Sequence, residues 1–167
     1  MLELMDKIYE IDKVKDFVTG KVIKASTIVT AKWVRFKCNG CRNYNTNLQC
    51  PPFSPTPEET QKILDEYEYA ILIRCMEGYD AVSEIPLILE KIAIGMEFYK
   101  AIGFSAGYCK VCEVCNLKNC INRDKTRPSM EACGIDVFST AKNNEFEMVG
   151  EKDGKKIFYY FVLVLLR

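Results

Sequence analysis

The chain has 167 residues, of which 49% are apolar, and its 23 Lys and Arg residues balance its 23 Asp and Glu residues. This composition is typical of a globular protein with a packed core, and it excludes the disordered and fibrous classes. The sequence contains no histidine, which excludes Ser/His and Cys/His nucleophile pairs, mixed Cys/His zinc fingers and haem with an axial histidine.

The first part of the chain predicts a helix, a strand and a second helix. Apolar residues at helical spacing indicate a helix over residues 3–18. Alternating β-branched and aromatic residues indicate a strand over 27–37, so the first cysteine pair is expected at a strand end. In CPPFSPTPEE, Thr56 and Glu59 form a capping box with a proline in the first turn, and a helix is expected over 57–66.

The second part predicts two more helices and a C-terminal hairpin. YAILIRC indicates a short buried strand, and helices are expected over 82–102 and about 130–142. EFEMV and KIFYYFVLVLL are expected to pair through a turn at Asp153 and Gly154. The apolar run in the last segment is shorter than the ~20 residues of a membrane helix, so we interpret it as a buried strand.

The elements predict a single α+β domain over residues 1–167, with a mixed sheet and helices, because no repeat or linker divides the sequence. Its loops are expected to bring two cysteine groups, at 38–50 and 109–120, to one edge. The segment MLELMDKIYEIDK lacks the apolar run of a signal peptide, so we expect a cytoplasmic protein with no membrane partner. The cytoplasm keeps thiols reduced, which favours metal ligation over disulfides for the nine cysteines.

Four of these cysteines lie within one loop. Cys109, Cys112 and Cys115 form a CxxCxxC motif, and Cys120 follows. A tetrahedral zinc ion holds its sulfur ligands about 3.8 Å apart, which a CxxC pair reaches easily and a third cysteine at the same spacing reaches with difficulty. A 4Fe-4S cluster takes one thiolate per iron at separate corners. The spacing therefore favours a 4Fe-4S cluster over zinc, with Cys120 or a distant cysteine as the fourth ligand.

The distant candidates are Cys38 and Cys41 in CNGC and Cys50 in LQCPP. This group is one ligand short of four, so it either borrows a ligand, forms a partly occupied site, or holds reduced thiols that only stabilise a loop. Cys75 lies on the apolar face of a predicted strand and is expected in the core. Cys133 shares a helical face with apolar residues, which indicates core packing; as an eighth thiolate ligand, it would instead complete two four-cysteine sites.

Basic residues flank both cysteine groups. Neighbouring cations favour thiolate over thiol and offset the negative charge of a cluster with four thiolates. The alternative is an ordinary solvated basic loop. The residues concerned are Lys37, Arg42, Lys110, Lys118, Arg123, Lys125 and Arg127.

Three segments, WVRFKCNGCRNYNTNLQCPPFSPTPEET, AGYCKVCEVCNLKNC and RPSMEACGIDV, resemble a prokaryotic family of cysteine-rich proteins described as predicted metal-binding and otherwise of unknown function. The resemblance covers about residues 33–140, in the same order. It departs at Asn45, where the family has glycine. The resemblance implies that Ser129 caps a helix and that Arg127 approaches a cofactor. It also implies metal binding by Cys38, Cys41, Cys50, Cys109, Cys112, Cys115 and Cys120.

The leading hypothesis is an iron–sulfur protein that carries electrons, or helps to deliver a cluster, to a larger protein partner. It predicts no independent catalysis and no nucleic-acid partner. The alternative is a structural zinc module that binds a protein or a nucleic acid, with Lys32, Arg35 and Lys37 on phosphates and aromatic residues stacked on bases. A third hypothesis is thiol–disulfide or methyl-transfer chemistry at one reactive cysteine.

Overall fold

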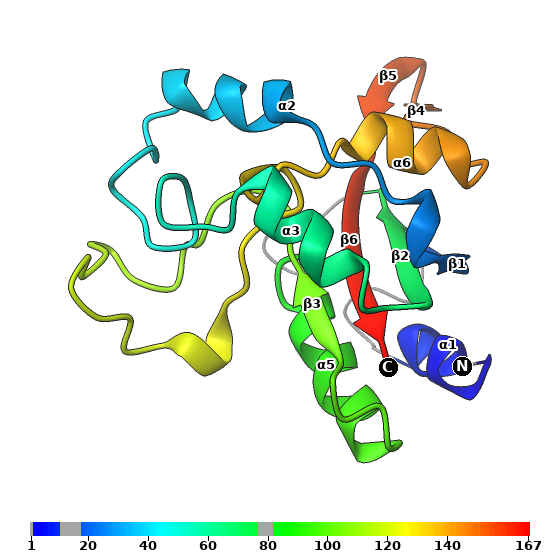
Figure 1. The fold of residues 1–167 in the computed structure, drawn as a ribbon. Coiled ribbons are helices and arrows are strands. Elements are labelled where there is room, and N and C mark those ends of the chain that lie inside the picture. Colours follow the sequence, from blue (N-terminus) through cyan, green and yellow to red (C-terminus); the bar gives the residue numbers. More distant parts are fainter. Residues whose placement is uncertain (1, 11–17, 77–81) are drawn as a thin grey trace.

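The computed structural model describes residues 2–10, 18–76 and 82–167 (Figure 1). A four-stranded sheet with the order β1-β2-β6-β3 forms its centre, and all of its strand pairs are antiparallel. With helices on both faces of this sheet, the expected α+β fold class is confirmed. The strands are β1 (Val18–Lys24), β2 (Tyr69–Cys75), β3 (Ile102–Phe104) and β6 (Tyr160–Leu166).

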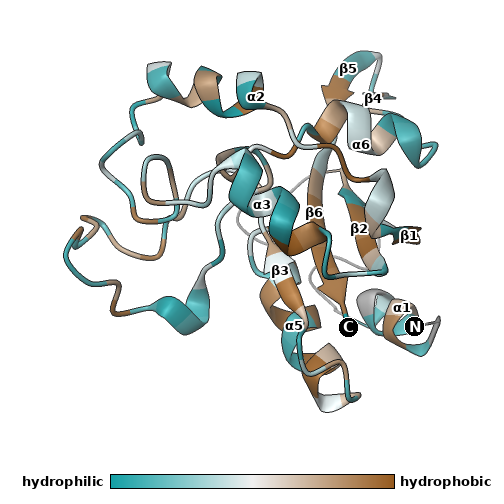
Figure 2. Cartoon of the chain, viewed as in Figure 1, coloured by the Kyte–Doolittle hydropathy of each residue, from teal (hydrophilic) through white to brown (hydrophobic). Residues whose placement is uncertain are grey.

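The two central strands are buried on both faces. Side chains alternate between the faces of a strand, so in β2 Ala70 and Leu72 pack into one core cluster while Ile71 and Ile73 pack into the other. Figure 2 shows the apolar colouring of β2 and β6 between the surrounding helices. The buried strands predicted from YAILIRC and from the C-terminal apolar run are therefore confirmed.

Helices cover both faces of the sheet. Leu4 of α1 (Leu2–Tyr9) and Leu89 of α5 (Ile85–Gly95) pack into one core cluster. Leu64 of α3 (Pro57–Leu64) and Ala141 of α6 (Val137–Asn143) pack into the other. Across the described ranges, every helix is too short or too polar to cross a membrane.

Two predictions from local sequence chemistry are confirmed. The Thr56 hydroxyl accepts a hydrogen bond from the Glu59 N–H at 3.1 Å, and the Glu59 carboxylate accepts one from the Thr56 N–H at 2.8 Å, completing the capping box of α3. In the hairpin of β4 (Val149–Lys152) and β5 (Lys155–Phe158), Asp153 and Gly154 have φ values of 52° and 73°. Positive φ at both positions is typical of a type I′ turn.

The predicted strand over 27–37 is wrong, because Lys32–Lys37 forms helix α2. Its aromatic residues do not pack on a sheet: Trp33 is 47% exposed and Phe36 is 72% exposed. The Ala31 N–H donates to the Gly134 carbonyl oxygen at 2.8 Å instead of to a neighbouring strand. The edge of the sheet is formed by β1, which pairs with β2 and which the sequence patterns did not predict.

The three other predicted helices have different limits. The first part of the helix expected over 3–18 is observed as α1. Residues 11–17 lie outside the described residues, and Val18 already belongs to β1. The helix expected over 82–102 ends at Gly95, because the chain turns through Glu97 (φ 72°) and then pairs with β6 as β3. The helix expected over 130–142 is divided by Gly134 (φ 76°) into a short turn and α6.

Candidate metal centre

The first cysteine segment begins where α2 ends. A 3-10 turn over Cys38–Gly40 follows the helix, and the Cys41 N–H donates to the Cys38 carbonyl oxygen at 2.9 Å. Farther along, the Cys50 carbonyl oxygen accepts a hydrogen bond from the Phe53 N–H at 3.0 Å. Tight backbone turns thus position all three cysteines of this segment.

Asn45 lies between the CNGC and CPP motifs and has a φ of 57°. This is the left-handed region, which glycine favours and asparagine tolerates better than most residues. The Asn45 N–H donates to the Pro51 carbonyl oxygen at 2.8 Å, which closes the loop on itself. Asparagine at position 45 therefore stands in a backbone conformation that suits glycine.

The two cysteine segments pack against each other, as the sequence predicted (Figure 1). The Asn47 side-chain amide donates to the Cys109 carbonyl oxygen at 3.0 Å. The Leu48 N–H donates to the Sγ atom of Cys115 at 3.4 Å. One segment thus supplies hydrogen bonds to the backbone and to a sulfur atom of the other.

A cavity of about 200 Å³ lies beside the first segment. Among the described residues, no three Cys, Asp or Glu side chains converge closely enough to hold a single metal ion. Three thiols instead border this common space, together with one carboxylate. The wall consists of Cys38, Cys41, Asn43, Tyr44, Cys50, Pro51, Gly107, Tyr108, Ser129, Glu131 and Ala132.

Cys50 is electrostatically linked to cysteines of both segments. Burial, together with the smaller effect of the charges of four neighbouring cysteines, raises the pKa of Cys50 to about 12. Several negative thiolates held this close together repel one another, and a bound metal cation reverses that penalty. The donor set therefore fits a cationic metal centre. The four neighbours are Cys38, Cys41, Cys109 and Cys115.

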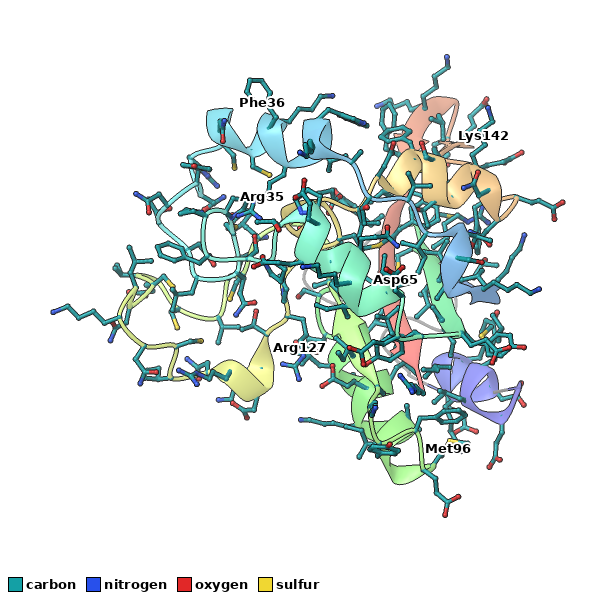
Figure 3. All side chains as sticks on the ribbon, viewed as in Figure 1. Arg35, Phe36, Asp65, Met96, Arg127 and Lys142 are labelled. Carbon is teal, nitrogen blue, oxygen red and sulfur yellow. The ribbon has the colours of Figure 1, made fainter. Side chains whose placement is uncertain are left out.

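Arg35 supplies a cation beside this region. Its Nη2 atom donates to the Pro52 carbonyl oxygen at 3.0 Å, whereas its buried Nη1 atom has no hydrogen-bond partner among the described residues. The guanidinium charge lowers the pKa of Cys38 and Cys133, against the effect of burial. Figure 3 shows Arg35 beneath α2 and Phe36 on the opposite side of this helix. An unpaired buried donor beside thiols is suited to an anionic thiolate-ligated group.

Arg127 is engaged by a carboxylate on α5 (Figure 3). Its Nε atom donates to Glu90 Oε2 at 2.9 Å, and its Nη2 atom binds Glu90 Oε1. Its Nη1 atom donates to the carbonyl oxygens of Arg123 and Thr126, each at 2.8 Å. These bonds tie the end of the second cysteine loop to α5. The cofactor contact of Arg127 stays a prediction.

The second cysteine loop, residues 109–122, is anchored at two sulfur atoms. Cys115 accepts the bond from Leu48, and the Sγ atom of Cys112 accepts from the Asn122 side-chain amide at 3.2 Å. Cys112 is exposed, whereas Cys109, Cys115 and Cys120 are partly buried. Metal ligation by these four cysteines, and by the three of the first segment, stays a prediction.

Cys75 and Cys133 lie in the two core clusters and are both 0% exposed. Their expected packing in the core is confirmed. Burial raises the pKa of each thiol to about 12. Both thiols therefore remain protonated and apolar at neutral pH.

We expect iodoacetamide at pH 8 to modify the exposed Cys41 and Cys112 of metal-free native protein, and to leave Cys75 and Cys133 unmodified. With a pKa near 12, about one buried thiol in ten thousand is ionised at this pH. Peptide mass spectrometry after timed quenching measures each site, and the same reaction in denaturant is the control. Modification of Cys133 as rapid as that of Cys41 would contradict its burial.

Two charged residues of the site were not singled out as site residues by the sequence patterns. The Arg35 guanidinium was assigned only to phosphate contacts of the zinc alternative, although its burial beside Cys38 and Cys133 gives it a local role. Glu131 stands inside the RPSMEACGID motif and borders the cavity lined by Cys38, Cys41 and Cys50, which we call the three-cysteine cavity. Protein atoms around its carboxylate raise the pKa of Glu131, although the side chain remains solvent-accessible. The charge of Glu131 raises the pKa of Cys38 and Cys133, which places it near both thiols.

Comparison with known families gives one match, and it covers most of the chain. The model of a family described as "Predicted metal-binding protein (DUF2284)" matches residues 21–166. No curated protein and no solved structure matches the chain. The matched range contains both cysteine segments and the RPSMEACGID motif. This chain therefore belongs to the DUF2284 family of predicted metal-binding proteins.

Proposed function

We propose that this protein binds a 4Fe-4S cluster through its cysteine segments and passes electrons, or the cluster itself, to a protein partner. The observation that carries this proposal is the position of Cys50, which borders the cavity with Cys38 and Cys41 and lies within electrostatic reach of Cys109 and Cys115. Thiols from two remote segments are thus assembled in one region. When bound, the cluster would supply one-electron redox chemistry.

The arrangement of the thiols favours a cluster over a single zinc ion. The four sulfur ligands of a zinc ion lie about 3.8 Å apart and leave room between them only for the ion itself. The three thiols here border about 200 Å³ of space, several times the volume of about 30 Å³ that one water molecule occupies in the liquid. A cube with four irons needs ligands at separate corners around such a space, and the CxxCxxC spacing of the second loop suits it as well.

Hydrogen bonds and charge at the cysteines are of the type that tunes such clusters. N–H groups of Leu48 and Asn122 donate to the sulfur atoms of Cys115 and Cys112. The buried guanidinium of Arg35 lies near Cys38. Donors and cations near thiolate ligands stabilise the added negative charge of a reduced cluster.

A protein partner is supported by the surface of the second cysteine loop. Three apolar residues between its cysteines and one after Cys120 are exposed, and basic residues lie on the loop and just beyond it. Exposed apolar side chains beside an excess of basic residues are typical of docking surfaces, so the partner surface is expected to be acidic around an apolar centre. The apolar residues are Val111 (43% exposed), Val114 (86%), Leu117 (40%) and Ile121 (75%), and the basic residues are Lys118, Arg123 and Lys125.

Anaerobic reconstitution tests the proposed function. Metal-free protein is incubated with ferrous iron and sulfide in one sample and with zinc in another, and each is then desalted. We expect the first sample to become brown, with a visible absorption band that bleaches on reduction by dithionite and returns on oxidation, and with a raised Tm. If only zinc is retained and only zinc raises the Tm, the structural zinc module is the correct function.

A further inference from the structure

The three-cysteine cavity supplies three thiols where a four-iron cube has four corners. Among the described residues that line it, Glu131 is the only carboxylate. This side chain comes from the turn Glu131–Cys133, which is remote in sequence from the cysteines of the first segment. The cavity thus joins three soft sulfur donors with one hard oxygen donor.

Hydrogen bonds from three directions fix the turn that carries Glu131. The Ser129 hydroxyl accepts from the Ala132 N–H at 3.1 Å, although the N-cap of this 3-10 turn is Met130 and not Ser129 as expected. The Ser54 hydroxyl, four residues after Cys50, donates to the Ala132 carbonyl oxygen at 2.7 Å. The Thr60 hydroxyl donates to the Cys133 carbonyl oxygen at 2.7 Å. The carboxylate is therefore presented from a rigid support that is bonded directly to the cysteine segment.

Glu131 also stands at a boundary between two spaces. A second cavity of about 430 Å³ shares Cys38, Cys41 and Glu131 with the three-cysteine cavity. Its remaining wall is rich in aromatic side chains, among them Trp33, the single tryptophan of the chain. Glu131 thus belongs, with Cys38 and Cys41, to the wall between the two cavities.

We propose that Glu131 is a carboxylate ligand of the metal centre and completes a three-cysteine, one-glutamate set with Cys38, Cys41 and Cys50. This inference rests on the proposed function, because it assigns the fourth corner of a cluster held in the first cavity. Carboxylate oxygen binds iron less tightly than thiolate sulfur does. Glu131 would therefore hold the most readily exchanged ligand position, and this residue also lines the aromatic cavity.

The test compares wild type with E131Q, E131C and the control E113Q. Glutamine keeps the size of the side chain and removes the anionic donor, cysteine replaces it with a thiolate, and Glu113 lies exposed between Cys112 and Cys115. Each protein is reconstituted with iron and sulfide without oxygen. The readouts are iron and sulfide per chain, the rate of iron loss to a chelator, and the electron paramagnetic resonance spectrum after reduction.

We expect E131Q to lose iron to the chelator at least about tenfold faster than wild type, with E113Q unchanged. E131C is expected to retain iron with an altered spectrum. Equal iron content, chelation rate and spectrum in E131Q and wild type would overturn the assignment. If E131Q does not fold, the result for E131C decides, because loss of iron from E131C would also overturn the assignment of Glu131 as a ligand.

Failure of the proposed function gives a different result. If wild type takes up zinc and no iron–sulfur cluster, the cluster is rejected and the same variants are titrated with zinc. An affinity for zinc at least about tenfold lower in E131Q than in E113Q would then support ligation by Glu131, and equal affinities would overturn it. A wild-type protein that binds neither metal overturns both proposals.

Discussion

Replacement of Cys50 by serine is expected to lower the affinity for the metal at least about tenfold, and with it the metal retained through purification, the largest effect of any single cysteine. Cys50 borders the cavity with Cys38 and Cys41 and also lies within electrostatic reach of Cys109 and Cys115. Its loss therefore removes a donor at the point where both segments meet. Metal analysis of anaerobically purified C50S, with chain concentration from amino-acid analysis, measures the effect.

The matched control is Cys75→Ala, which also deletes one buried thiol. Cys75 lies in the core cluster that includes α1 and α5, so the variant is expected to lose stability and to keep its metal. Circular dichroism shows whether each variant is folded. Full metal content in folded C50S would contradict the central place of Cys50.

Gly134→Ala is expected to destabilise the protein by about 2–5 kcal/mol, through backbone strain together with overpacking. Gly134 has a φ of 76°, where an alanine is strained, and its added Cβ would lie 2.9 Å from Pro57 Cβ and 3.1 Å from Pro57 Cα, and would clash with Pro57 Cγ. The first turn of α3 cannot yield easily, because the capping box fixes it. At roughly 2–4 °C per kcal/mol for a chain of this size, Tm should fall by about 4–20 °C.

The control for this variant is Gly95→Ala, at the end of α5, where an added Cβ meets no atom within 4 Å. It is expected to leave Tm unchanged or to raise it slightly. Gly134 directly follows the turn that carries Glu131, and its carbonyl oxygen accepts a hydrogen bond from the N–H of Ala31, the residue before α2. G134A should therefore weaken metal retention as well. An unchanged Tm would show that the RPSMEACGID segment tolerates a shift.

The elements that the sequence predicted well are those determined by neighbouring residues. The capping box before α3 and the Asp153–Gly154 turn depend on contacts within three residues. The strand β2 is recognisable because burial on both faces requires a continuous apolar run. In each case the physical cause lies within the predicted segment itself.

The elements that were missed depend on distant partners. Lys32–Lys37 alternates like a strand, yet it forms a helix, and the place beside β2 is taken by β1. Helix α5 ends early because β3 pairs with β6, which lies about sixty residues farther along the chain. Sequence patterns within one segment do not contain these contacts.

The candidate site shows the same division. The meeting of the two cysteine segments was expected from the loops of the predicted fold, and the first segment is one thiol short of four ligands. The contacts of Asn47 and Leu48 confirm that the segments meet. The burial of Arg35 and the place of Glu131 beside Cys38 arise only when α2 and the RPSMEACGID turn pack together. From one sequence alone, nothing distinguishes a metal-binding glutamate from the other glutamates of the chain.

The most direct test of a thiolate-bound metal centre is the iron, sulfide and zinc content per chain of protein purified without oxygen, measured before and after chelation together with Tm. The proposed function predicts iron and sulfide in near-equal amounts, close to a whole number of clusters per chain, and a Tm that falls when the metal is removed. Freshly purified protein that contains neither iron nor zinc, with a Tm that chelation leaves unchanged, would contradict a metal centre at these cysteines.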